Sequence, residues 1–212
     1  MFQADEAVMS MICRFVEVSP GLLGRLEQDP DIADVLFHEP VAFARIEIDE
    51  SARPVYQERL ERILGGAASA TAVLERLTHP APAPELEGKG ESLSIEEAWH
   101  GVHYLLTGRT EPGCEPAAEP ILGGIEIGDD QGYGPVRYYT PALVGTLAAS
   151  LAAQDEKAMA LRFHPERMEQ LAIYPRGWDE TRLEWLVAEF QKLRSFYARA
   201  AAGGNGVVTC LV

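Results

Sequence analysis

Apolar and polar residues alternate at the start of the patterned part of the chain. In residues 11–18 (MICRFVEV), Val16 and Val18 fall on one face and Cys13 and Phe15 on the other, which predicts a β-strand. The residues before this segment show no such pattern, so residues 1–8 are expected to form a loose leader.

A spacing of three to four residues between apolar positions follows in many later segments and predicts helices. Several of these segments begin with a residue that caps helix N-termini, at Ser19 and Thr140 followed directly by proline. Helices are expected from Ser19, over Ile32–Phe37, in two pieces of residues 54–77 on either side of Gly65-Gly66, from Ser94 to about Gly108, from Thr140 to about Gln154, from Asp155, from His164-Pro165, and from Asp179 or Thr181 to Gly203. The helix at Ser94 has the capping-box spacing to Glu97, and the last helix is the longest.

Strands are also expected at 121–128, 136–139 and 206–212. Residues 79–92, rich in Pro, Gly and Glu, predict an exposed loop, and a second loop is expected at 110–120. Because strands fall at both ends and in the middle without βαβ alternation, the predicted class is α+β, with a small mixed or antiparallel sheet covered by several helices. A long C-terminal helix followed by a final strand completes a single domain expected over residues 9–212.

The net charge of the chain excludes some classes of binding partner from those expected. Asp and Glu number 33 against 18 Lys and Arg, for a net charge of −15. Such a surface repels phosphate backbones and anionic membranes, so neither nucleic acid nor a membrane is an expected partner. A basic protein partner or a metal cation stays electrostatically open.

The three cysteines, Cys13, Cys114 and Cys210, are far apart and form no CxxC pair. They predict neither a disulfide framework nor a structural zinc site. The N-terminus carries acids where a signal peptide has basic residues, and no run of about 18 apolar residues occurs. A reduced, cytoplasmic protein is expected.

The stretch EEAWHGVHYLLTG (96–108) carries the first candidate site. His100 and His103 are three residues apart on a predicted helix, so their imidazoles could share a ligand, with Tyr104 beside them. No HExxH or Cys/His pattern supplies further ligands, so no metal is predicted. The alternatives are hydrogen-bonding histidines in a helix packed with aromatic residues, and an acid–base or ligand-binding pair.

Two later stretches complete the candidate cleft. In GYGPVRYY (132–139), Tyr133 and Arg137 could hold an anionic or planar group, and the alternative is a tight turn with an arginine ion pair. In IYPRGWD (173–179), Trp178 and Asp179 fit a packed aromatic ring beside a helix-capping carboxylate. No nucleotide-binding loop or GxSxG elbow occurs, so no cofactor is expected and no catalytic residue is assigned.

Taken together, MSMICRFVEVSPGLLGRL, AWHGVHYLLTG, ILGGIEIG, GYGPVRYYTP and IYPRGWD resemble the YfbM-like family, a bacterial family whose function is unknown. The resemblance runs from about Met9 to the end and leaves out the leader and the 79–92 loop. It implies a single-domain α+β fold and supplies no activity or catalytic residue.

Two hypotheses about function follow. The leading one is a non-enzymatic cytoplasmic protein that binds a protein partner, in one version an immunity-type protein that neutralises a basic toxin. The alternative is a small-molecule binding protein or enzyme. Its cleft would be built from His100, His103, Tyr104, Tyr133, Arg137, Trp178 and Asp179.

Overall fold

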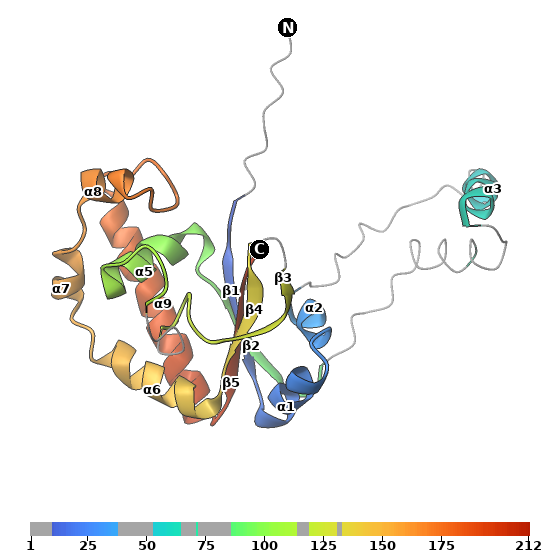
Figure 1. Ribbon diagram of the computed structural model, residues 1–212, viewed down its shortest axis with the longest axis horizontal. Helices are drawn as coiled ribbons and strands as arrows, with labels where there is room; N and C mark the ends of the chain where they lie inside the picture. The colour runs from blue at the N-terminus through green and yellow to red at the C-terminus, as the bar shows by residue number, and fades with distance from the viewer. Residues whose placement is uncertain (1–9, 38–52, 65–70, 72–85, 114–118, 131–132) are drawn as a thin grey trace, which may run out of the picture. The chain divides into compact units, whose positions relative to one another are not determined.

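The computed structural model of the chain describes residues 10–37, 53–64, 71, 86–113, 119–130 and 133–212 (Figure 1). The chain divides into two compact units, residues 1–33 with 86–212, and residues 34–85. The single domain expected from the sequence over residues 9–212 stays a prediction. The expected leader and, apart from residue 71, the expected helix after Gly65-Gly66 lie outside the described residues.

The larger unit is built on a five-stranded sheet in the order β2-β1-β5-β4-β3. The strands are β1 (Cys13–Val18), β2 (Lys89–Ser94), β3 (Ile125–Asp130), β4 (Pro135–Tyr139) and β5 (Gly206–Leu211). All four neighbouring pairs are antiparallel, so the α+β class is confirmed with an antiparallel sheet. The last strand, β5, thereby lies between β1 and β4, next to the first strand of the chain.

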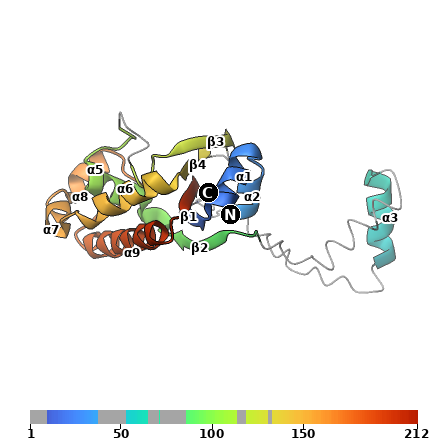
Figure 2. The same cartoon turned by 90° about the horizontal axis from the view of Figure 1, so that it is seen from below.

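Helices cover both faces of this sheet (Figures 1 and 2). They are α1 (Pro20–Gln28), α5 (Trp99–Thr107), α6 (Pro141–Ala152), α7 (Glu156–Ala160), α8 (Pro165–Gln170) and α9 (Arg182–Ala202), with the short 3-10 helix η1 (Glu96–Ala98) before α5. Helices α5, α6 and α9 lie on one side of the sheet and α1 on the other. The long C-terminal helix followed by a final strand is therefore confirmed.

Two further helices were also expected from the sequence. Helix α2 (Ile32–Phe37) has the bounds that the sequence predicts. Helix α3 (Arg53–Leu64), in the smaller unit, confirms the first helical piece of residues 54–77.

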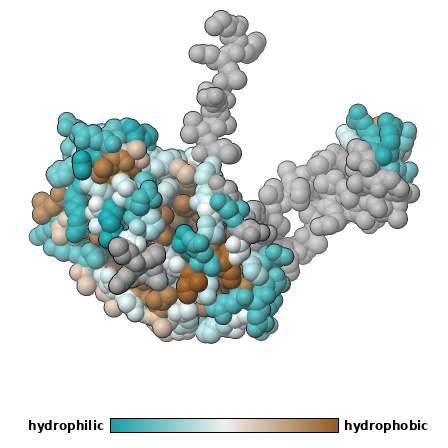
Figure 3. Space-filling model, viewed as in Figure 1, coloured by the Kyte–Doolittle hydropathy of each residue, from teal (hydrophilic) through white to brown (hydrophobic). Residues whose placement is uncertain are grey.

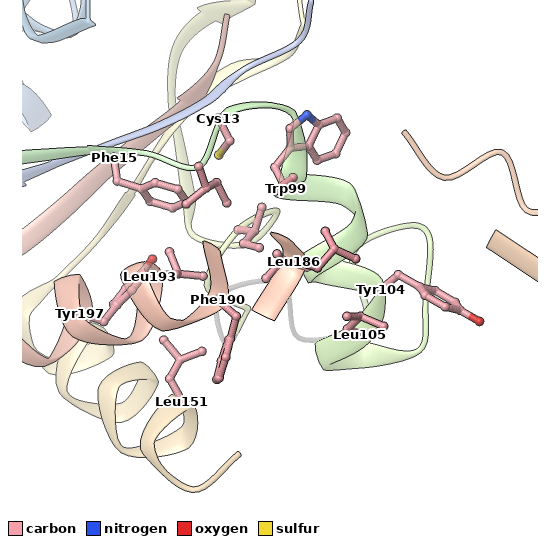
Figure 4. Packing of buried hydrophobic residues seen from close by; sticks show 14 of the residues in the cluster. Cys13, Phe15, Trp99, Tyr104, Leu105, Leu151, Leu186, Phe190, Leu193 and Tyr197 are labelled. Atoms are coloured by element: carbon pink, nitrogen blue, oxygen red, sulfur yellow. The ribbon is translucent and has the colours of Figure 1, made fainter. Parts of the chain in front are cut away.

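The main core lies between the sheet and the α5–α6–α9 layer. Its fully buried aromatic residues include Phe15 of β1, Tyr139 of β4 and Tyr197 of α9. The rings of Phe15 and Tyr139 each contact that of Tyr197, and Figure 4 shows Phe15 and Tyr197 in this core. Gly101 of α5 lies so close to α9 that an added Cβ would come within 2.8 Å of Leu186. Because interiors are packed nearly as densely as crystals, a larger residue at this position would push α5 away from α9.

The predicted helix starts at Ser19 and Thr140 are confirmed. The Ser19 Oγ accepts the backbone N–H of Leu22 at 3.2 Å, and the Thr140 Oγ1 accepts that of Leu143 at 3.4 Å. In both helices proline takes the first helical position, where no hydrogen bond from its nitrogen is needed.

The predicted capping box at Ser94 is wrong. Ser94 is the last residue of β2, opposite Arg14 of β1, and its Oγ accepts the N–H of Glu96 at 3.1 Å. The Glu97 carboxylate accepts the Tyr174 hydroxyl at 3.0 Å instead of reaching back to Ser94. The helix therefore begins at Trp99, and it ends as predicted at Gly108, whose φ of 72° suits glycine.

The starts of two strands also differ from the predicted ones. Residues 89–92, predicted as the end of an exposed loop, form the start of edge strand β2, and their side chains are exposed. Pairing with β1 gives this polar segment its strand conformation, which its composition does not indicate. The strand predicted at 121–128 begins only at Ile125, because Gly124, with a φ of 91°, turns the chain immediately before it.

The visible face of the larger unit mixes hydrophilic and hydrophobic surface (Figure 3). Among the described residues, no helix combines the length and apolar character needed to cross a membrane.

Candidate functional site

A pocket of about 240 Å³ lies in the larger unit, between the N-terminal part of α5, the segment after it, and the β3–β4 hairpin. It is lined by Cys13, Trp99, His100, Thr110, Glu111, Pro112, Ile121, Leu122, Tyr133, Gly134, Pro135, Arg137, Thr209, Cys210 and Leu211. We call Trp99, His100 and residues 110–112 the α5 wall, and residues 133–135 with Arg137 the hairpin wall. The residues from β1 and β5 form the floor.

The strand register explains why Arg137 reaches this pocket. Arg137 lies opposite Thr209 of β5, and Thr209 lies opposite Phe15 of β1. Residues directly opposite in an antiparallel pair share a face, so all three point to the side of α5 and α9. Across β1, β5 and β4, these three side chains form one row. Phe15 at one end packs against Phe196 of α9, whereas Thr209 and Arg137 line the pocket.

On the hairpin wall, Arg137 donates from Nη2 to the Glu126 carboxylate at 2.6 Å. The Arg137 side chain is 23% exposed, and that of Glu126 is 61% exposed. Tyr133 directly precedes Gly134, whose N–H donates to the Asp130 carboxylate at 3.1 Å. The ion pair expected for Arg137 is present, and Arg137 also lines a pocket together with Tyr133.

On the α5 wall, both ring nitrogens of His100 are engaged. Its Nδ1 accepts the backbone N–H of Tyr174 at 3.1 Å, so the proton of the neutral ring is on Nε2, which donates to the Thr110 carbonyl at 3.0 Å. The ring stacks on Trp99 with centroids 4.8 Å apart. Burial lowers the pKa of His100, more than the Thr110 carbonyl raises it. The neutral ring therefore shapes the wall and leaves no nitrogen for a metal or a substrate proton.

His103 faces the interior and does not line the pocket. Its Nε2 lies 3.3 Å from the Glu111 carbonyl, and its Nδ1 lies 3.9 Å from the Glu119 carboxylate. Burial lowers the pKa of His103, more than the Glu119 charge raises it. His100 and His103 thus hold the carbonyls of two consecutive residues, Thr110 and Glu111, and fasten the α5 wall to its helix.

Glu119 holds the segment of the α5 wall in place, and the sequence did not reveal this role. Its carboxylate pairs with Arg109 and accepts the N–H of Gly113 at 2.9 Å, although its side chain is only 6% exposed. Its backbone carbonyl accepts the Tyr139 hydroxyl at 2.6 Å. The stretch TEPGCEPAAEP has the composition of a loop, and nothing in it distinguishes Glu119 from the other glutamates.

Three of the predicted site residues lie elsewhere. Tyr104 is buried, and Figure 4 shows its ring directed away from Cys13 and Trp99. Trp178 donates from its indole to the Ile173 carbonyl at 2.8 Å and packs in the core. Asp179 accepts the N–H and the hydroxyl of Thr181 just before α9, and these bonds lower the pKa of Asp179.

The pocket therefore brings together His100, Tyr133 and Arg137 of the seven predicted residues. His103, Tyr104, Trp178 and Asp179 do not line it. The three residues that line the pocket come from different parts of the fold: His100 from α5, Tyr133 from the segment between β3 and β4, and Arg137 from β4.

The floor offers thiols that are not reactive near neutral pH. Burial raises the pKa of the Cys13 thiol far above its usual range, more than its contact with the Thr209 hydroxyl lowers it. Burial likewise raises the pKa of Cys210 to about 12. Since the thiolate is the reactive form, neither cysteine can serve as a nucleophile there. Over the described part of the chain, no three His, Cys, Asp or Glu side chains gather as a metal site would require.

Comparison with known proteins gives a family and a fold. A family model described as a domain of unknown function, DUF1877, matches residues 9–210. The crystal structure of YfbM, a protein of unknown function from Escherichia coli, matches with a TM-score of 0.58 at 18% identity, covering 95% of this chain and 99% of that one. No curated protein matches the chain. The resemblance to the YfbM-like family is confirmed.

Proposed function

Because the chain belongs to the DUF1877 family, which carries no assigned activity, we propose a function from the pocket itself: the protein binds a small polar molecule there without transforming it. The observation that carries this proposal is the convergence of His100, Tyr133 and Arg137 from distant segments on one cavity. Concave sites with apolar walls and a few polar groups are the usual form of ligand sites.

The state of the polar groups favours binding over catalysis. A general base needs a free lone pair near its substrate, and both nitrogens of His100 already have backbone partners. A nucleophilic cysteine needs a lowered pKa, and burial raises that of Cys13. Arg137 is the lining residue best suited to hold a ligand, since a guanidinium binds without reacting.

We further propose that the protein works in a reducing compartment, the cytoplasm. Cys13 and Cys210 are both free thiols, which is the usual state of cysteines in that compartment.

The experiment follows the indole N–H signals of the ¹⁵N-labelled protein while small anions, cations and neutral compounds are added. Trp99 lines the pocket and donates its indole N–H to the Met11 carbonyl, whereas buried Trp178 and partly buried Trp185 lie outside the pocket. A ligand of the pocket is expected to shift the Trp99 signal in a saturable way and to leave the other two indoles in place.

Two matched variants locate the binding. Leu122 lines the pocket, so Leu122→Phe fills part of it and is expected to weaken the ligand, whereas Leu161→Phe changes a side chain that is 78% exposed and should not. If no compound shifts Trp99, or if both variants bind equally, the proposal fails.

The hypothesis of a protein partner stays a prediction, motivated by the net charge of −15. Complementary charge would make such an association salt-sensitive. A pull-down at low salt that recovers one basic protein, released at high salt, would support it, and recovery of no specific partner would count against it.

A further inference from the structure

Arg137 carries more hydrogen-bonding capacity than its ion pair uses. Its guanidinium has five N–H donors, and among the described residues it bonds one acceptor, the carboxylate of Glu126. The Arg137 side chain is largely buried, at 23% exposed, and it lines the pocket. A ligand in the pocket would therefore meet a guanidinium with N–H donors that no described residue uses.

The carboxylates near Arg137 favour some anionic ligands over others, according to the charge that the ligand carries. Glu126 is bonded to Arg137 from the more exposed side, and Glu111 lines the same pocket on the α5 wall. Two carboxylate-bearing residues therefore accompany one guanidinium at the pocket. Their charges repel a doubly charged phosphate group more strongly than a singly charged carboxylate, which also matches the fork of donors that arginine presents.

The apolar residues of the pocket and its volume limit the size and polarity of the rest of the ligand. Trp99, Ile121 and Pro135 contribute apolar surface, and Trp99 and Ile121 are buried. The volume of about 240 Å³ is below the roughly 300–1,000 Å³ typical of sites for drug-sized molecules. The site has room for a compact group such as a single ring or a short aliphatic chain.

We propose that the pocket is specific for a small monocarboxylate with an apolar or aromatic body, bound through Arg137. The carboxylate lies against the guanidinium beside the hairpin wall, and the body packs toward Trp99 and Ile121. This inference rests on the proposed ligand-binding function and adds the chemical class of the ligand.

The test compares benzoate, 3-phenylpropionate and hexanoate with their uncharged amides and with phenyl phosphate, each followed at the Trp99 indole signal. At least one monocarboxylate is expected to saturate the shift, and its amide to bind roughly tenfold more weakly or worse, because a charge-assisted hydrogen bond is lost. Phenyl phosphate is expected to bind more weakly than benzoate.

The variants assign the effect to the guanidinium. Arg137→Gln is expected to weaken the carboxylate about tenfold or more while leaving the amide unchanged, and Arg137→Lys to give an intermediate loss. Arg176→Gln is the matched control, because Arg176 pairs with Glu169 outside the pocket and its loss should change neither ligand. Unchanged Trp178 and Trp185 indole signals show that each variant is folded.

The failures are distinguishable. Equal binding of acid and amide, tighter binding of phenyl phosphate, or carboxylate binding that survives Arg137→Gln overturns the carboxylate class and leaves the pocket as a ligand site. If the monocarboxylates do not bind and other compounds do shift Trp99, the class is again wrong. If nothing shifts Trp99, both this inference and the proposed function fail.

Discussion

The α5 wall and the hairpin wall of the pocket are held by different kinds of contact. The α5 wall is fastened by buried groups, since His100, His103 and Glu119 bond backbone atoms of residues 110–113. On the hairpin wall, the charged side chain Arg137 is bonded to Glu126, whose carboxylate is mostly in water. The first arrangement fixes the shape of the pocket, and the second leaves a charged group available to a ligand.

Because of this difference, we expect the contacts of the α5 wall to govern stability and those of the hairpin wall to govern ligand affinity. Buried polar contacts contribute strongly to stability, because their loss leaves donors and acceptors without water. Exposed ion pairs contribute little, because solvent screens them. Substitutions on the α5 wall should therefore unfold the protein more readily, and substitutions on the hairpin wall should change ligand affinity at nearly constant stability.

The largest expected effect is that of Glu119→Ala. It removes the partner of Arg109 and of the Gly113 N–H, and should lower the free energy of unfolding by roughly 1–3 kcal/mol. Urea unfolding measures the change. The control is Glu126→Ala, which removes the partner of Arg137 in the hairpin wall and is expected to stay within about 0.5 kcal/mol of the parent. Equal losses in the two variants would remove the distinction between the walls.

The second prediction concerns pH. Burial lowers the pKa values of His100 and His103 below the usual 6.5, so the unfolded chain binds protons more readily than the folded one. The stability that the neutral rings provide is complete above pH 6.5 and is lost as the pH falls below it. Urea unfolding at pH 7.5 and 5.5 should show this decrease.

A variant assigns this decrease to its source. His103→Gln removes one of the two groups and should make the dependence between pH 7.5 and 5.5 shallower. A dependence that His103→Gln does not change would show that its imidazole does not titrate as burial requires.

The smallest expected effect on stability is that of Arg137→Gln. Since the Glu126 carboxylate is 61% exposed, the pair should contribute no more than about 0.5 kcal/mol. Thermal unfolding should give nearly the parental midpoint, while affinity for a carboxylate falls. A stability loss as large as that of Glu119→Ala would make Arg137 a structural residue and weaken its assignment to binding.

Much of the fold could be predicted because local signals agreed with tertiary contacts. Ser19-Pro20 and Thr140-Pro141 mark helix starts whatever packs against them, and the alternation in residues 11–18 matches a strand buried on both faces. Local signals failed where pairing decided the outcome. Ser94 has the spacing of a capping residue, but it pairs with Arg14 of β1 as the last residue of β2.

The site was less predictable, because helical spacing gives a face and not the depth of burial. His100 and His103 lie on one side of α5, yet only His100 lines the pocket, and His103 is completely buried. Trp178 and Asp179 carry the residue types of a cleft and instead serve packing and a turn before α9. Glu119 could not be found, since only the fold shows which glutamate of its loop is buried.

A crystal structure of the protein with bound benzoate tests the central claim most directly. The account predicts the carboxylate within about 3 Å of the Arg137 guanidinium and the ring against Trp99 and Ile121 in the pocket. Benzoate bound at another surface, or lying in the pocket with its carboxylate turned away from Arg137, would contradict it.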